Sequence, residues 1–168
     1  MSLFIFFHII FNMKLTFKQK IKIEETLKDF ICLLSRYNQV KDDDVLLDLF
    51  LSRNRNPLFD LTGSNFWNTG LSSKNALNDK GKKVKDHFIP RKIAMGYIME
   101  KLNSDPNITL DDFIDLCKRY GSTIYLTKEE HKKITSVAKN TGKSNYEFYE
   151  ECGVVVEGID ELINKIKM

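Results

Sequence analysis

Cysteine and histidine are scarce in this chain of 168 residues, which contains three of each. The cysteines are odd in number, lie far apart and form no CxxC pair, which argues against both a disulfide framework and a cysteine zinc site. They are Cys32, Cys117 and Cys152. We therefore expect an intracellular, reducing location such as the cytoplasm.

Long apolar runs are lacking as well. The stretch from Leu3 to Phe11 is about half of the roughly 20 residues that a membrane-spanning helix needs. No basic region precedes it and no small-residue cleavage site follows it. We expect no membrane partner, and residues 1–13 are interpreted as a core strand, a disordered apolar tail, or a leader translated upstream of a true start at Met13.

Net charge is low, at +3, which is too mild to indicate a nucleic-acid partner by itself. The charge is segregated, however. Lys74 to Lys92 contains seven basic and two acidic residues, and Lys128 to Lys143 contains five basic and two acidic residues. If these two segments meet in space, they form a face that attracts phosphate groups.

Apolar residues make up 42% of the chain, enough for the core of one domain spanning 1–168. Helical spacing covers 18–37, and a second helix over 42–53 opens with three aspartates. The segment 54–81 is rich in polar residues and glycine and is interpreted as mostly loop. The division expected within the domain is a helical and loop part over 14–80, a core over 81–141 and a helical tail over 142–168.

The core is expected to contain two short strands and a helix. The first strand ends at Asp86-His87, helices follow over 91–103 and 110–120, and a β-branched run over 122–126 forms the second strand. A capping box from Thr127 to Glu130 then opens a helix that carries His131 in its first turns. The fold class is therefore α+β and mostly helical, with the three side chains of Asp86, His87 and His131 placed to converge. Phosphodiester hydrolysis needs such a set, because it requires a base for water and a means of stabilising charge.

These residues resemble the HNH, or ββα-metal, endonuclease family over about 84–138. The run DHFIP is similar to the first strand of the family, and STIYLTKEEHKKI is similar to its second strand and helix. The resemblance implies that His87 is the general base and that Asp86 and His131 are metal ligands. It implies a divalent cation, Mg²⁺ or Mn²⁺, with Zn²⁺ or Ni²⁺ as alternatives. Where the family has an asparagine that pins the loop between the strands, this chain has Ser122 and Thr123.

Basic residues near these motifs are the expected phosphate-binding groups, and Arg can hold a phosphate through two donors. They are Lys85, Arg91, Lys92 and Lys132. The loop residues expected to contact substrate are Trp67 and Lys74. For Trp67 the favoured alternative is that the ring anchors its loop on the core, because exposed aromatic side chains are costly. Ordinary surface charge remains the alternative for the basic residues.

Three functions stay open from the sequence. The first is a metal-dependent endonuclease acting on nucleic acid, with DNA the expected substrate, which would need a homodimer to cut both strands. The second is a non-catalytic nucleic-acid-binding protein with a degraded metal site. The third is a small helical protein-interaction module.

Overall fold

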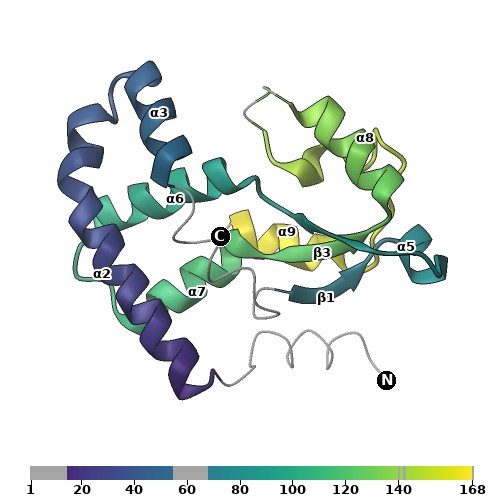
Figure 1. Cartoon of the computed structure of the whole chain (residues 1–168), viewed down its shortest axis with the longest axis horizontal. Coiled ribbons are helices and arrows are strands. Elements are labelled where there is room, and N and C mark those ends of the chain that lie inside the picture. Colours follow the sequence, from purple (N-terminus) through teal and green to yellow (C-terminus); the bar gives the residue numbers. More distant parts are fainter. Residues whose placement is uncertain (1–14, 55–67, 140, 142, 168) are drawn as a thin grey trace. The chain divides into compact units, whose positions relative to one another are not determined.

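The computed structural model describes residues 15–54, 68–139, 141 and 143–167. Residues 1–13 and Trp67 lie outside these ranges. The described residues form seven α-helices, one short 3-10 helix and a mixed sheet of three strands (Figure 1). The predicted class, α+β and mostly helical, is confirmed.

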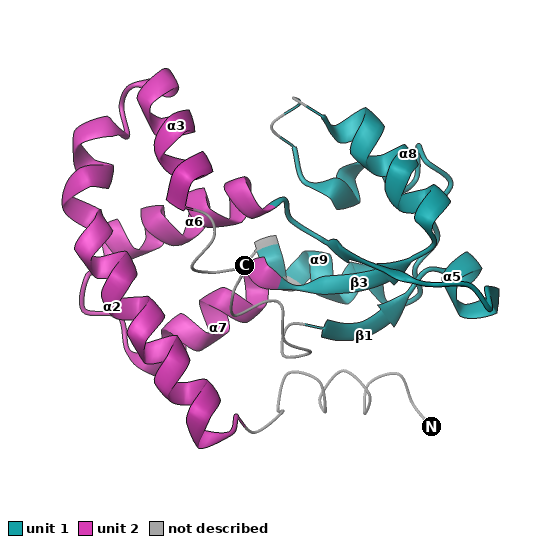
Figure 2. Cartoon of the chain, in the orientation of Figure 1, with its two compact units in different colours: residues 1–13, 67–90, 122–168 teal, residues 14–66, 91–121 magenta. Residues whose placement is uncertain are grey.

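The described residues form two compact units, and in each unit they come from two separate stretches of sequence (Figure 2). The helical unit contains the described residues of 15–54 and 91–121. The sheet unit contains the described residues of 68–90 and 122–167. The helices inserted between the two predicted strands thus belong to the same unit as the N-terminal helices.

The helical unit consists of α2 (Phe17–Val40), α3 (Asp44–Asn54), α6 (Arg91–Ser104) and α7 (Leu110–Gly121), close to the predicted ranges. Thr16 caps α2 by accepting a hydrogen bond from the Gln19 backbone N–H at 3.3 Å. The core of the helical unit includes Phe30 and Phe113, whose rings meet edge to face with centroids 5.9 Å apart. Burying a large apolar side chain contributes about 1.5–3 kcal/mol, so this packing is the main stabilisation of the unit.

The sheet unit contains β1 (Asn68–Ser72), β2 (Val84–His87) and β3 (Thr123–Leu126) in the order β1-β3-β2. Strand β3 runs parallel to β1 and antiparallel to β2, with Asp86 opposite Ile124 and His87 opposite Thr123. The helices of this unit are α5 (Lys74–Asn78), α8 (Lys128–Ala138), the 3-10 helix η2 (Asn145–Phe148) and α9 (Ile159–Lys167). The sheet therefore places the end of β2 beside the start of β3.

Over 68–81, strand β1 and helix α5 correct the prediction of a mostly loop segment. Strand β1 raises the number of strands among the described residues from the two expected to three. The residues of β1, NTGLS, contain one β-branched side chain and a glycine with φ of 76°, so no strand pattern is visible in them. Tertiary contacts stabilise the strand instead. The Thr69 hydroxyl donates to the Thr123 carbonyl at 2.9 Å, and the Asn68 side-chain amide donates to the Tyr125 hydroxyl at 3.0 Å.

Two further expectations concern membrane-spanning helices and disulfide bonds. Within the described ranges, every helix is too short or too polar to cross a lipid bilayer. All three cysteines are described and are free thiols, with Cys117 buried and Cys32 exposed.

Candidate functional site

Strand β2 and helix α8 supply the two residues at the centre of the candidate site. Antiparallel pairing with β3 fixes β2, and α8 begins directly after β3. The predicted capping box at the start of α8 is confirmed: the Thr127 hydroxyl accepts from the Glu130 N–H at 3.2 Å, and the Glu130 carboxylate accepts from the Thr127 N–H at 2.9 Å. This box fixes the first turn of α8, which carries His131 towards β2.

Asp86 and His131 form a hydrogen-bonded pair within the sheet unit. The Asp86 Oδ1 atom lies 3.0 Å from His131 Nδ1, although the two residues are 45 positions apart in sequence. The Asp86 side chain is 1% exposed, whereas the His131 side chain is 36% exposed. The two residues expected as metal ligands therefore contact each other directly, and the pair joins a buried carboxylate to a partly accessible imidazole.

The hydrogen bond to Asp86 raises the pKa of His131 above its ordinary value, and partial burial of the ring works against that rise. A carboxylate at Nδ1 fixes the proton of the neutral ring on that nitrogen. His131 Nε2 has no hydrogen-bond partner among the described residues. The arrangement can therefore accept a proton at Nε2 and stabilise the resulting imidazolium through Asp86.

Two residues that the sequence did not single out complete the surroundings of Asp86. The Asn145 side-chain amide donates to Asp86 Oδ1 at 3.2 Å and to the His87 carbonyl at 2.9 Å. The Tyr149 hydroxyl donates to Asp86 Oδ2 at 2.9 Å. Burial raises the pKa of Tyr149 well above its ordinary value, and the charge of Asp86 adds to the rise, so the hydroxyl stays protonated as a donor.

His87, the expected general base, is the last residue of β2. Neighbouring side chains of a strand project to opposite faces, so the strand directs His87 away from the face that carries Asp86. In register, His87 lies opposite Thr123, while Asp86 lies opposite Ile124. The structure thus unites Asp86 with His131, and strand geometry separates His87 from that pair.

Ser122 and Thr123, which stand where the resembling family has its asparagine, contact this region through their backbone. The Ser122 carbonyl accepts from the Phe88 N–H at 3.1 Å, and Thr123 pairs with His87 in the sheet. A side-chain amide does hold the end of β2, but it comes from Asn145, beyond α8. No local sequence signal could have linked Asn145 to β2, because 58 positions separate it from His87.

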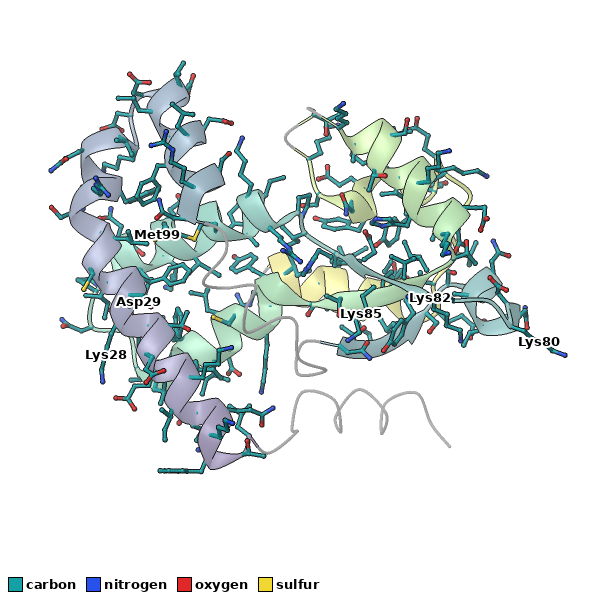
Figure 3. The ribbon with its side chains drawn as sticks, viewed as in Figure 1. Lys28, Asp29, Lys80, Lys82, Lys85 and Met99 are labelled. Atoms are coloured by element: carbon teal, nitrogen blue, oxygen red, sulfur yellow. The ribbon has the colours of Figure 1, made fainter. Side chains whose placement is uncertain are left out.

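The expected phosphate-binding lysines of the sheet unit lie on two elements. Lys85 projects from β2, and its Nζ lies 6.0 Å from the centroid of the Tyr125 ring (Figure 3). Lys80 and Lys82 lie on the segment that leads from α5 into β2 (Figure 3). Lys132 follows His131 on α8 and lines an open hollow of about 480 Å³. The residues lining it are Lys132, Lys133, Ser136, Val137, Glu151 and Cys152.

Other basic candidates have protein partners or belong to the helical unit. Lys74, at the start of α5, lies 3.6 Å from Glu157, and both side chains are largely exposed. Arg91 and Lys92 begin α6, in the helical unit, and Lys92 forms an ion pair with Asp48 of α3. The charge of Lys92 is therefore offset within its own unit.

The donor atoms around Asp86 do not form a ready shell for a divalent cation. Both Asp86 oxygens accept hydrogen bonds from Asn145, Tyr149 or His131. Among the residues that the structure describes, no group of three or more His, Cys, Asp or Glu side chains is placed to hold one metal ion. Mg²⁺ and Mn²⁺ favour oxygen ligands, and here the carboxylate oxygens are already engaged. The expected metal requirement stays a prediction, and the chemistry below uses the chain's own residues.

Comparisons with protein-family models, with curated proteins and with solved structures gave no match to this chain. The resemblance to the HNH family consequently depends on the residues of the two motifs alone. The site geometry is the stronger support for a functional proposal.

Proposed function

We propose that this chain is an endonuclease that hydrolyses phosphodiester bonds of nucleic acid, with the Asp86–His131 pair as its reaction centre. One observation carries the proposal: a carboxylate that is 1% exposed holds Nδ1 of an imidazole that is 36% exposed. Burying a carboxylate is costly unless its oxygens accept hydrogen bonds. Hydrogen bonds to Asp86 offset this cost, and Asp86 in turn orients His131, whose partly exposed ring is accessible to a substrate.

In the proposed reaction, Nε2 of His131 removes a proton from water as the water oxygen forms a bond to phosphorus. The bond from phosphorus to the leaving sugar oxygen then breaks on the opposite side of the phosphorus, where that oxygen takes a proton from solvent, and the imidazolium releases its own proton to solvent. Asp86 stabilises the imidazolium between these steps. Lys132, which follows His131 on α8, is the proposed partner of the phosphate oxygens. Lys85 neighbours Asp86 on β2, as His87 does, so strand alternation directs it away from the pair.

The roles implied by the family resemblance are thereby partly exchanged. His131, rather than His87, is the proposed base, because its Nδ1 has a carboxylate partner and its Nε2 remains available. The Mg²⁺ or Mn²⁺ that the resemblance implies stays a prediction, because the oxygens of Asp86 already accept hydrogen bonds. The proposed substrate is DNA, and the proposed location is intracellular, as the free thiols favour.

Supercoiled plasmid incubated with the protein, with and without EDTA, tests the proposed function. We expect nicking by the wild-type chain, and we expect His131→Ala to lower the rate by about 10²–10⁴-fold, the usual contribution of general acid–base catalysis. Thr135→Ala is the matched control, because it changes an exposed, uncharged residue one turn further along α8. Its rate should stay near that of the wild type.

The outcome with EDTA tests the metal requirement separately. Loss of nicking in EDTA would support the expected metal, and unchanged nicking would show that the chain's own residues suffice. Absence of nicking in every divalent cation tested would contradict the enzyme.

A non-catalytic nucleic-acid-binding protein is the second candidate, and the engaged oxygens of Asp86 favour it over a metal-dependent enzyme. It predicts DNA binding that weakens steeply with salt and no cleavage under any condition. The third candidate, a protein-interaction module, predicts no affinity for nucleic acid.

A further inference from the structure

The segment after α8 packs directly against the candidate site, although it lies beyond the stretch that resembles the nuclease family. Asn145 opens the 3-10 helix η2, and Tyr149 follows that helix. Both side chains donate hydrogen bonds to Asp86, across 59 and 63 positions of sequence. They are 8% and 3% exposed, so water does not compete freely for these bonds.

The donors divide between the two oxygens of Asp86. Oδ1 accepts from Asn145 at 3.2 Å and faces His131 Nδ1 at 3.0 Å, while Oδ2 accepts from Tyr149 at 2.9 Å and, over a longer distance of 3.4 Å, from Asn145. A buried carboxylate with donors on both oxygens has little freedom to rotate, since rotation would leave charged oxygens without partners. The Tyr149 hydroxyl therefore determines which oxygen remains for His131.

Aromatic packing anchors this segment to the end of β2. The Phe88 ring stacks on Tyr146, with centroids 4.5 Å apart, and meets Tyr149 edge to face at 5.9 Å. Phe88 directly follows His87 and is fully buried. The distance between Asn145 or Tyr149 and the carboxylate is consequently set by a packed core, rather than by a free loop.

We propose that Asn145 and Tyr149 are positioning residues of the site: by holding both oxygens of Asp86, they keep His131 in the tautomer that carries its proton on Nδ1 and leaves Nε2 as an acceptor. Neither residue needs to touch substrate. The role in catalysis rests on the proposed function, whereas the effect on the tautomer does not.

The test measures the tautomer of His131 by ¹⁵N NMR of the imidazole nitrogens in the full-length chain. The His131 signals are assigned by their loss in His131→Ala. Tyr149→Phe keeps the ring and removes the donor to Oδ2. Tyr125→Phe is the matched control, because it removes a hydroxyl of the same unit whose partner is Asn68 rather than Asp86.

In the neutral ring we expect the Nδ1–H tautomer to dominate in the wild type and in Tyr125→Phe. In Tyr149→Phe the population of the Nε2–H tautomer should rise by about threefold or more, as expected for the loss of one hydrogen bond to a charged group. Unchanged ¹⁵N shifts in a folded Tyr149→Phe would overturn the proposal. A purely structural tyrosine would lower stability without moving these shifts.

Asn145→Ala provides a second variant, since it removes the donor to Oδ1 and leaves Tyr149 in place. It should move the His131 shifts in the same sense. If both variants lost the fold, the proposed local role would be wrong. If nicking occurs, Tyr149→Phe should lower the cleavage rate constant and leave the half-saturating DNA concentration unchanged; if the wild type does not cleave, the tautomer measurement still decides this proposal independently of the proposed function.

Discussion

Replacing Asp86 with asparagine is the perturbation for which the structure makes the most specific prediction. The substitution keeps the size of the side chain and removes the charge that three donors surround. An amide offers one oxygen as an acceptor, and its NH₂ group would face Asn145, Tyr149 or His131, which are themselves donors. At least one buried donor should therefore lose its acceptor.

The size of the expected loss in stability follows from the burial of the donors around Asp86. Asn145 and Tyr149 are both buried, and a buried donor without a partner costs about 1–3 kcal/mol. We expect the free energy of unfolding of Asp86→Asn to be lower than that of the wild type by about 2–4 kcal/mol. The partner His131 adds a smaller amount, because its side chain is 36% exposed and solvent screens the interaction.

The His131 contribution should depend on pH. Asp86 raises the pKa of His131 in the folded chain above the ordinary value of 6.5. Stability from this pair is therefore fully present below the unfolded pKa and is lost as the pH rises through the folded pKa. The destabilisation caused by Asp86→Asn should be larger near about pH 5.5 than near about pH 8.5.

Urea denaturation, followed by circular dichroism at these two pH values, measures both the total loss in free energy of unfolding and the pH-dependent share that comes from His131. Asp79→Asn is the control, because it makes the same chemical change at an exposed position of the same unit. A loss for Asp86→Asn no larger than the control would refute the buried network. Equal losses at both pH values would refute the pairing with His131.

Three other substitutions test individual contacts. Glu130→Gln should lower the free energy of unfolding by about 1–2 kcal/mol, because the buried carboxylate caps α8 and accepts from the Ser73 hydroxyl at 2.6 Å; an unchanged urea midpoint would contradict this. Lys92→Ala should cost less than about 1 kcal/mol, since its pair with Asp48 is solvent-exposed; a loss above about 2 kcal/mol would show that the pair does more than an exposed ion pair does. Lys132→Ala should weaken DNA binding for all sequences alike and reduce the slope of log affinity against log salt concentration by about one. Fluorescence-anisotropy titrations at several salt concentrations measure this slope. An unchanged slope would exclude Lys132 from phosphate binding.

Local patterns were sufficient to predict the described helices other than α5 and two of the strands. The spacing of Ile23, Leu27 and Phe30 predicted α2, and these residues are buried in the structure. The capping box at Thr127 predicted the start of α8, because a cap involves only residues three positions apart. In the same way, the motif at Asp86 indicated the end of a strand and the motif at His131 indicated the start of a helix. The structure brings these two side chains together.

Contacts between distant residues were beyond the reach of these patterns. Strand β1 lacks alternating apolar residues and exists through its pairing with β3 and the bond from Thr69 to Thr123. Asn145 and Tyr149 lie on a segment predicted only as part of a helical tail, and nothing in their spacing points to Asp86. Strand alternation, which separates Asp86 from His87, does follow from the sequence once β2 is assigned.

The relative nicking rates of His131→Ala and His87→Ala test the central claim most directly. Both variants remove one imidazole from the sheet unit, and circular dichroism checks that each is folded. If the Asp86–His131 pair is the reaction centre, His131→Ala should lose at least about 100-fold in rate, and His87→Ala should retain much more of the wild-type rate. Loss of nicking in His87→Ala together with a near wild-type rate in His131→Ala would contradict the account.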